Sequence, residues 1–378
     1  MDRTKKMKIK KSNKLKIALI YRQKPVDYDI DKYYIFDDKD TIDCIIKTLK
    51  EIADEVIDID ANKSKDIYED INKLKGKVDI VFNIANNGVN DQIGTLINIF
   101  VDYLSIPYIG SNAETLNDVS DKSKTKIILN YYGIEIAPFQ VFSSYLQKLN
   151  RKLNFPLIVK PIYGGSSFGI TQESVVYSYK DLVKQIKKVI KSYKQPALVE
   201  EYLEGIEYTI GVIGNKKLFV FPVISFDLNK LDGKPKVRDY HVKLIDKECS
   251  KILEYTKDTR KFYNKISNIS VKAFIILKCN DLARMEIREK DGGLYFIEIN
   301  AKPGLDPNHS DLPSMAKCAG IEYKELIAII IYEALKRYNL EPNDKIYDII
   351  ENVNKKINFI KVGKLSNSKN YYLLKNLT

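Results

Sequence analysis

Apolar and polar positions in the first hundred residues alternate between the period of a strand and the period of a helix. Buried-strand patterns occur at residues 15–21 and 77–84, and EVIDID lies between them as a further strand. Helical spacing of apolar residues occurs near 42–56, 63–75 and 92–104. Repeated β–α units of this size predict an α/β domain with a parallel sheet and right-handed crossovers.

A smaller α+β unit is predicted from about residue 111. Its pattern indicates a helix over SDKSKTKIILNYYG that ends at Gly133, followed by the strands IAPFQVF and FPLIVKP. A Gly/Ser loop, YGGSSFGI, comes next, and a polar helix near 179–193 leads to the strand ALVEEYL. We therefore expect a compact unit whose strands are joined by one glycine-rich loop and one helix.

The pattern changes to antiparallel strands from about residue 200. The strands YTIGVIG and KLFVFPVISF flank a hairpin at Asn215, and a charged loop without periodicity covers 227–247. A helix around 255–277 precedes a second hairpin, LARMEIREKDGGLYFIEIN, and the helix EYKELIAIIIYEALKRY follows it. The last segment, 341–378, is rich in Asn and Lys with weak periodicity, and no role can be assigned to it.

The composition is that of an ordinary globular protein of two or three domains. The chain has 378 residues, of which 44% are hydrophobic and 30% charged. The longest strongly apolar stretch, Ile327 to Tyr332, is far shorter than the roughly 20 residues of a membrane-spanning helix. No apolar core of signal-peptide length occurs near the N-terminus. These features predict a cytoplasmic protein without a membrane partner.

The residue types exclude several classes of site. The four cysteines are widely spaced without a CxxC pair, so a disulfide scaffold or a cysteine zinc site is not expected. Only two histidines are present, which excludes a three-histidine metal site. The chain has no GxGxxG loop after its first strand and no GxxxxGK(S/T) loop, which excludes the dinucleotide-binding fingerprint and a P-loop.

Much of the net charge of +12 lies in the first 16 residues, which hold eight Lys or Arg and one Asp. The rest of the chain is nearly neutral for its size, which argues against a nucleic-acid partner. We interpret residues 1–13 as a disordered basic leader, and a nucleic-acid or membrane-surface arm is the alternative.

The hairpin at 282–302 carries the most informative cluster. If its three-residue turn is centred on Gly292, Glu286 lies opposite Glu298 and Arg284 lies opposite Asn300, all on one face of the sheet. Like charges directly opposite each other are destabilising, so the two glutamates call for a cation between them. Two carboxylates and an amide oxygen suit a hard cation, Mg²⁺ or Mn²⁺. The alternative is an exposed face whose carboxylates are neutralised by Arg284 and Arg288. The same pairing puts Met285, Ile287, Ile297 and Ile299 on the other, apolar face.

The Gly/Ser loop is a candidate phosphate site. Lys160 ends the preceding strand, and the backbone N–H groups of a glycine-rich loop can approach phosphate oxygens. An ordinary turn is the alternative for the loop alone. Glu200 and Glu207 could accept hydrogen bonds from ribose hydroxyls, although by themselves they fit a solvated surface face equally well.

Taken together, the ordered motifs resemble the D-alanine–D-alanine ligase family of ATP-grasp enzymes. The resemblance runs from about Val78 to Leu335 and rests on FNIANNG, DKSKTK, FPLIVKPIYGGSSFGI, LVEEYLEGIEYTI, DYHVK, LARMEI and FIEINAKPG with HSDLPSMAKCAGI. It implies a three-domain ATP-grasp fold, α/β and α+β, with an N-terminal parallel-sheet domain. The expected parts are the leader 1–13, the N-terminal domain 14–110, the central subdomain 111–199, the C-terminal subdomain 200–340 and the extension 341–378.

The resemblance also implies roles for individual residues. ATP would be bound by Lys122, Lys160 and Lys243, by the loop residues Gly165, Ser166 and Ser167, and by Glu200 and Glu207 at the adenosine. Mg²⁺ (or Mn²⁺) would be bound by Glu286, Glu298 and Asn300, where the family usually has Asp at the first position. The catalytic residues would be Arg284 and the Gly304 N–H as oxyanion donors, with Ser166 linking loops, and Ser310 would bind the second substrate.

The departures concern the first substrate. The family's N-terminal loop, whose Glu holds the ammonium of the first amino acid, is absent, and Asp27, Asp29 or Asp31 could supply a replacement. Asn86 and Asn87 stand where a histidine is usual, Leu244 where a Tyr is usual, and Gly164 where an acidic residue is usual.

We therefore expect an ATP-dependent, ADP-forming carboxylate–amine ligase that joins amino acids or peptides through an acyl phosphate. The alternatives are a genuine D-alanine–D-alanine ligase of cell-wall synthesis and a catalytically silent ATP-binding protein. Small-molecule substrates are the expected partners, together with a homodimer of the kind usual in the resembled family, and no nucleic acid is expected.

Overall fold

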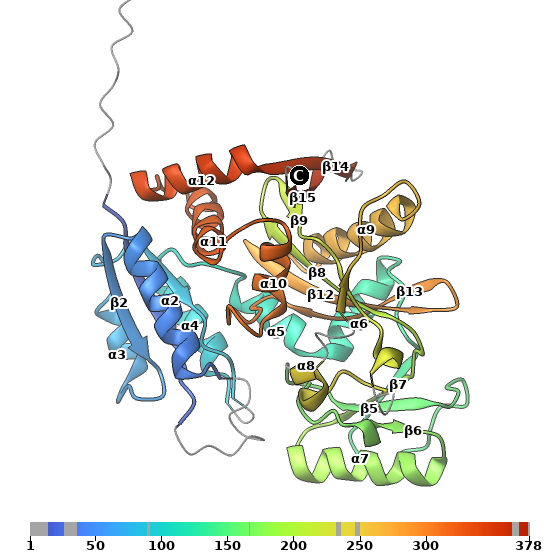
Figure 1. The fold of residues 1–378 in the computed structure, drawn as a ribbon. Coiled ribbons are helices and arrows are strands. Elements are labelled where there is room, and N and C mark those ends of the chain that lie inside the picture. The colour runs from blue at the N-terminus through green and yellow to red at the C-terminus, as the bar shows by residue number, and fades with distance from the viewer. Residues whose placement is uncertain are drawn as a thin grey trace, which may run out of the picture.

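The protein is described here by a computed structural model, which describes residues 14–25, 36–88, 91–165, 167–231, 236–245, 250–364 and 370–376. Three sheets organise the chain (Figure 1). One is parallel and the other two are mostly antiparallel, which confirms the predicted combination of α/β and α+β architecture. Within the described residues, no helix combines the length and the apolar character needed to span a bilayer.

The N-terminal sheet is parallel and has the order β2-β1-β3. Its strands are β1 (Lys16–Tyr21), β2 (Glu55–Asp60) and β3 (Ile80–Asn83). The helices between and after them are α2 (Lys39–Ile52), α3 (Ile67–Asn72) and α4 (Ile93–Tyr103). Strand β1 is almost entirely buried because helices cover both faces of the sheet, which explains its continuous apolar run. Asp38 caps α2 by accepting a hydrogen bond from the Thr41 N–H.

The second sheet has the order β4-β7-β5-β6 and lies near the bottom of Figure 1. Its strands are β4 (Phe139–Phe142), β5 (Leu157–Pro161), β6 (Val175–Val176) and β7 (Ala197–Glu201). Helix α7 (Tyr179–Tyr193) packs its apolar stripe of Leu182, Ile186 and Val189 against the sheet. Helices α5 (Ala113–Ser120) and α6 (Lys122–Tyr131) precede this sheet in the chain, and Asp121 caps α6.

The third sheet is the largest, with the order β11-β10-β8-β9-β15-β14 and the pair β12–β13 attached to β8. Its first strands are β8 (Glu207–Gly214), β9 (Leu218–Val220), β10 (Ile224–Phe226) and β11 (Ser250–Ile252). The predicted strand KLFVFPVISF is therefore interrupted, because Pro222 has no N–H to donate to a sheet. Helix α9 (Arg260–Ile276) packs on one face, and α10 (Asp311–Cys318) and α11 (Tyr323–Arg337) pack on the other.

The hairpin β12 (Leu282–Lys290) and β13 (Gly293–Asn300) has the predicted register at its functional end. Arg284 lies opposite Asn300 and Glu286 lies opposite Glu298. The turn differs from the prediction, because it has two residues, Asp291 and Gly292, both with positive φ. A bulge between Glu286 and Ile287 absorbs the difference.

The bulge changes which side chain packs into the core. Ile287 pairs with Phe296, so Phe296 takes the core position that the symmetric pairing assigned to Ile297. Ile297 instead lines a cavity together with Glu286. The prediction that Ile297 belongs to the apolar face was wrong, because a bulged residue leaves the alternation of the strand.

The C-terminal segment is more regular than its sequence pattern suggests. It forms α12 (Asp344–Lys356), β14 (Ile357–Lys364) and β15 (Asn370–Asn376), and β15 pairs in parallel with β9. Helix α12 crosses the top of the molecule in Figure 1. The Asn343 side chain at its start donates to Ile52 O at 2.9 Å and so connects α12 to the end of α2.

Candidate active site

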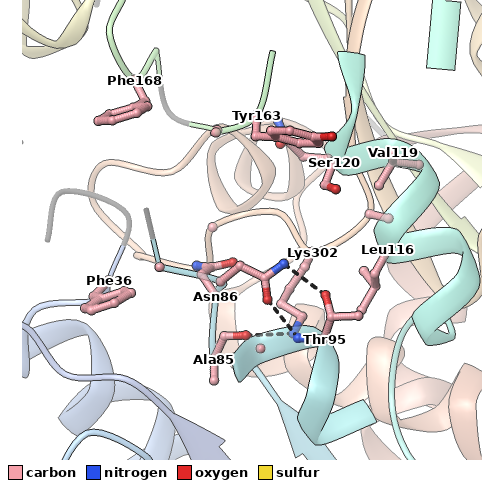
Figure 2. A pocket seen from close by; sticks show the side chains of 18 of the residues that line it. Phe36, Ala85, Asn86, Thr95, Leu116, Val119, Ser120, Tyr163, Phe168 and Lys302 are labelled. Carbon is pink, nitrogen blue, oxygen red and sulfur yellow. Dashed lines mark hydrogen bonds between the residues drawn. The ribbon is translucent and has the colours of Figure 1, made fainter. Parts of the chain in front are cut away.

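Two neighbouring cavities lie where the three sheets meet. The larger one, of about 500 Å³, lies between the N-terminal sheet, the Gly/Ser loop and the end of β13 (Figure 2). The smaller one, of about 60 Å³, lies between β5, β7, β12 and residues 237–243. Glu298 lines both, so the cavities meet at the hairpin.

The structure brings together the site residues that the sequence suggested, with the exception of Ser166, which lies outside the described residues. The larger cavity is lined by Lys122, Gly165, Arg284, Glu298, Asn300, Gly304 and Ser310. The smaller one is lined by Lys160, Ser167, Glu200, Glu207, Lys243, Glu286 and Glu298. These positions come from α6, β5, β7, β8, β12, β13, the short helix that contains Lys243 and two connecting segments. Only the tertiary fold makes them neighbours.

The facing carboxylates Glu286 and Glu298 form the centre of the site. Arg284 Nη1 donates to Glu286 Oε1 at 2.6 Å and to Thr209 Oγ1 at 3.2 Å. Burial opposes ionisation of Glu286, but Arg284 outweighs it and holds the pKa of that carboxyl below its usual range. Asn300 Nδ2 lies 3.4 Å from Glu298 Oε1.

This donor set suits a hard cation. In the part of the chain that the structure describes, no three His, Cys, Asp or Glu side chains cluster as a metal site. The candidate set has two carboxylates and one amide, and Mg²⁺ prefers such oxygen ligands, completing its shell with water and substrate phosphates. Glu286 and Glu298 are directly paired, and Arg284 forms an ion pair with one of the two carboxylates, so the residues present fit the ion.

Gly304 and Ser310 are packed against each other beyond the end of β13. A Cβ added at Gly304 would lie 2.7 Å from Ser310 Oγ, so a larger residue would have to displace the Ser310 hydroxyl. The Ser310 hydroxyl also accepts the Asp306 N–H at 3.1 Å. The loop that carries the Gly304 N–H is thereby held beside Ser310 and Arg284 on one cavity wall.

A buried ion-pair cluster forms the floor beneath the smaller cavity. Lys160 Nζ donates to Glu200 Oε2 at 2.7 Å, and Lys126 Nζ lies 3.3 Å from Glu200 Oε1. Burial opposes ionisation of Glu200, but the two lysines outweigh it and lower its pKa. Burial also lowers the pKa of Lys126, against the opposing effect of Glu200.

Lys126 was absent from the predicted set of site residues. A signal was present, because residues four apart on α6 share one face, and Lys122 and Lys126 have that spacing. Lys122 Nζ donates to Gly164 O at 2.5 Å, which fastens the Gly/Ser loop to the start of α6. Burial lowers the pKa of Lys122, although Glu298 opposes this.

The segment 236–245 packs over the smaller cavity. Ser167 Oγ donates to Arg238 O at 2.8 Å, and Gln172 Nε2 donates to Val237 O at 2.9 Å. The Arg238 guanidinium binds both carboxylate oxygens of Asp311, at 2.9 and 3.2 Å. The predicted loop thus contains a short helix, α8 (Tyr240–Ile245), and contacts both the Gly/Ser loop and α10.

Asp311 was also absent from the predicted set. Its carboxylate lies 3.5 Å from Arg284 as well as in the pair with Arg238. Burial opposes its ionisation, but the two arginines outweigh burial and keep the pKa of Asp311 well below its ordinary value. Asp311 therefore connects the segment over the smaller cavity with the hairpin arginine.

The end of the larger cavity toward the N-terminal sheet has its own charged residues. Lys302 Nζ donates to Ala85 O at 2.8 Å, and Asp37 lies on the same cavity lining. Burial raises the pKa of Asp37 to about 7. Figure 2 shows Lys302 beside Ala85 and Thr95, with Phe36 on one side and Tyr163 across the opening. The suggested replacements Asp27, Asp29 and Asp31 lie outside the described residues.

The two asparagines that stand where a histidine is usual also line this cavity. The Asn87 amide is occupied, because it accepts the Thr95 N–H at 2.8 Å and donates to Thr95 Oγ1 at 2.9 Å. Nearby, Arg22 binds Asp91 in a bidentate ion pair at 2.7 and 3.1 Å. The contacts of Asn87 fasten the loop after β3 to α4, and the Arg22 pair fastens the same loop to the end of β1. Asn87 therefore has a structural role.

Comparison with known proteins agrees with the geometry. A family model described as "D-ala D-ala ligase C-terminus" matches residues 128–332. The D-alanine–D-alanine ligase A of Bacillus cereus is 33% identical over 293 residues, which cover 76% of this chain and 89% of that protein. The D-alanine–D-alanine ligase of Aquifex aeolicus is 33% identical over 291 residues, covering 76% and 92%.

Solved structures show the same fold. A crystal structure of the D-alanine–D-alanine ligase of Bacillus anthracis in complex with ATP superposes with a TM-score of 0.64 and 23% identity. The superposition covers 86% of this chain and 99% of that ligase chain. The similarity in fold therefore extends over most of this chain and nearly all of that one.

Proposed function

The chain belongs to the D-alanine–D-alanine ligase family of ATP-grasp enzymes, and from that membership we propose how its site binds ATP, activates a carboxylate and selects its substrates. The class of activity is an ATP-dependent, ADP-forming ligase that joins a carboxylate to an amine. The single observation that carries the residue assignments is the pairing of Glu286 with Glu298 at the junction of two cavities, with Arg284 beside them.

The smaller cavity is the proposed nucleotide site. Lys160, Lys243 and the backbone of Gly165 and Ser167 surround its phosphate end, and Lys122 supplies a further positive charge from the adjoining wall. Glu207 is the proposed acceptor for ribose hydroxyls, because burial raises its pKa and hydrogen bonds from hydroxyls stabilise its charged form. Glu200 stands beside the adenine position, with its carboxylate occupied by Lys160 and Lys126.

Mg²⁺, or Mn²⁺ in its place, would be held by Glu286, Glu298 and Asn300, and when bound it supplies positive charge to the transferring phosphoryl group. Arg284 keeps Glu286 ionised and oriented for that purpose, as the 2.6 Å contact and the lowered pKa support. Asn300 lies beside Gly165, since a Cβ on that glycine would be 3.6 Å from Asn300 Oδ1. The Gly/Ser loop can therefore cover the same phosphate groups.

The larger cavity is the proposed substrate site. A substrate carboxylate attacks the γ-phosphorus of ATP, ADP leaves, and an acyl phosphate forms. An amine then attacks the acyl carbon and inorganic phosphate leaves. Arg284 and the Gly304 N–H, which line this cavity, are the proposed donors to the tetrahedral oxyanion, a contribution typically worth about 10²–10³ in rate per donor. Ser310, packed on Gly304, is the proposed contact for the carboxylate of the amine substrate.

We propose amino acids or peptides as the substrates, with the pair differing from two D-alanines. Leu244 stands where the family has a tyrosine, and the ammonium-binding glutamate loop is absent. Synthesis of D-alanyl-D-alanine is the rival, supported by the names of the relatives. A silent ATP-binding protein is less well supported, because facing glutamates beside Arg284 have no use without a bound cation.

The test is a screen for phosphate release from ATP and Mg²⁺ with D- and L-amino acids and dipeptides. Phosphate release in equal amount to ADP and to a new amide supports the ligase. The Arg284→Met variant serves as control, because it removes the oxyanion donor and should lose the activity. ATP binding without phosphate release for any amino acid or dipeptide would favour the silent protein.

A further inference from the structure

The wall of the larger cavity holds two charged groups with hydrogen-bonding capacity that the protein leaves unused. Among the described residues, no donor is bonded to the Asp37 carboxylate, and Lys302 makes one hydrogen bond, to the carbonyl of Ala85. An ammonium group has three donors, so two remain at Lys302. Neither residue belongs to a side-chain ion pair in the part of the chain that the structure describes.

The neighbouring polar groups are already satisfied. Asp306 accepts hydrogen bonds from Thr41 Oγ1 at 2.9 Å and from the backbone N–H groups of Asn308 and His309. Asp38 caps helix α2. Asp91 is bound by Arg22, as described above. Among the described residues at this end, Asp37 and Lys302 thus keep hydrogen-bonding capacity for a ligand. Lys24 lines the same cavity and adds a positive charge within electrostatic range of Asp37.

Their positions relative to the reaction centre are informative. Lys302 lies on the same loop as Gly304, whose N–H is a proposed oxyanion donor. Asp37 lies just before α2 and within electrostatic range of Lys302. A molecule whose reactive carboxylate lies at Arg284 and Gly304 would thus meet the Lys302 amine and the Asp37 carboxyl in the remainder of the cavity. Burial lowers the pKa of Lys302 to about 7, so a ligand group of opposite charge would favour the ionised form of each residue.

Opposite charges on a ligand would satisfy both groups. We propose that the first substrate is a dicarboxylic amino acid, whose ammonium binds Asp37 and whose second carboxylate binds Lys302 while the other carboxylate is phosphorylated. This inference rests on the proposed ligase function and adds the substrate class. The hydrogen-bonding positions that Asp37 and Lys302 leave open give a reason for a substrate that brings both counter-charges.

A set of matched probes tests the inference. Glutamate has all three charged groups, norvaline lacks the second carboxylate, and glutarate lacks the ammonium. Hydroxylamine traps an acyl phosphate as a hydroxamate, so no knowledge of the amine substrate is required. Both enantiomers of glutamate are tested, together with aspartate. With ATP and Mg²⁺ we expect hydroxamate from glutamate, at a kcat/KM about 10- to 100-fold above the values for norvaline and glutarate.

Variants locate the recognition. Lys302→Met should lower kcat/KM for glutamate about 10- to 100-fold and leave that for norvaline unchanged, and Lys302→Arg should restore part of the loss. Asp37→Asn should reduce the preference for glutamate over glutarate. Lys324→Met is the matched control, because Lys324 is half-exposed in a surface pair with Glu51. Thermal unfolding of each variant monitors folding.

Three results would overturn the inference. Hydroxamate from alanine or norvaline without any from glutamate or aspartate leaves the ligase function standing and removes the substrate class. An equal loss for both probes in Lys302→Met would show that Lys302 only fastens the loop to Ala85. Absence of hydroxamate from every amino acid and dipeptide would remove the proposed ligase function itself, and the inference with it.

Discussion

Lys160 Nζ lies 2.7 Å from Glu200 Oε2, and this buried pair joins two residues that the sequence assigned to different parts of the nucleotide. Lys126 lies against the other oxygen of the same carboxylate. The cluster of Lys160, Glu200 and Lys126 therefore has one positive charge in excess. That excess, with Lys122 nearby, gives the floor of the proposed nucleotide cavity a positive charge, which would attract a triphosphate.

Removal of members of this cluster should have unequal effects on stability. Glu200→Gln leaves two buried lysines without a counter-charge and should cost about 3–5 kcal/mol of unfolding free energy. Lys126→Met should cost less, because Glu200 keeps Lys160. Lys124→Met on the same helix is the control, because its pair with Asp118 is half-exposed and worth about 0–1 kcal/mol. Denaturant unfolding measures all three, and equal losses for Lys126→Met and Lys124→Met would contradict the assignment.

Glu298→Gln should abolish turnover and leave the fold intact. The change removes a carboxylate charge from the proposed cation site without altering its size, and it relieves repulsion with Glu286. Phosphate release as a function of Mg²⁺ concentration is the measurement. Glu289→Gln, near the turn of the same hairpin, keeps an acceptor for Tyr208 and should retain activity. Normal activity of Glu298→Gln at limiting Mg²⁺ would show that the cation is bound elsewhere.

Asp311 should contribute a pH-dependent part of the stability. Its pKa is lower in the folded protein than the value of about 3.9 in an unfolded chain, because two arginines outweigh the effect of burial. The ionised form thus stabilises the fold above pH 4, and this contribution is lost as the pH falls through the folded-state pKa. Asp311→Asn should be less stable at pH 7 by about 3 kcal/mol and approach the wild type in acid. Unfolding between pH 2 and 7 tests this, and parallel curves would exclude the mechanism.

Bound nucleotide should make the segment 236–245 less accessible to protease. Its contacts to Ser167, Gln172 and Asp311 close it over the smaller cavity, and Lys243 gains a partner when phosphate is present. Limited proteolysis should cut this segment more slowly with an ATP analogue and Mg²⁺ than without them. Arg238→Met should increase cleavage in the absence of nucleotide, since it loses the pair with Asp311. Equal cleavage under both conditions would argue against a lid.

Much of the architecture and the facing carboxylates of the candidate site followed from local patterns, whereas the proposed ATP-binding roles came from the family resemblance. The pairing of Glu286 with Glu298 could be predicted because side chains alternate along a strand and a short turn fixes the register nearby. The displacement of Ile297 could not, because a bulge depends on the fit of both strands to β8 and to the core. The regular structure of the last residues was also missed, since β15 pairs with β9 over a long separation in sequence.

The amino-acid sequence by itself determined the element types, the hairpin with its facing carboxylates and the order of the ATP-grasp motifs, because each depends on neighbours within one or two elements. Only the tertiary structure decided which charges meet. Three pairs show this: Lys126 with Glu200, Arg238 with Asp311, and Asp37 with Lys302 in one cavity. The members of each pair are 73 or more residues apart in the chain, and the periodicity of the sequence does not record such pairings. The physical reason is that the energy of a buried charge depends on its burial and its partners, and both are properties of the folded chain.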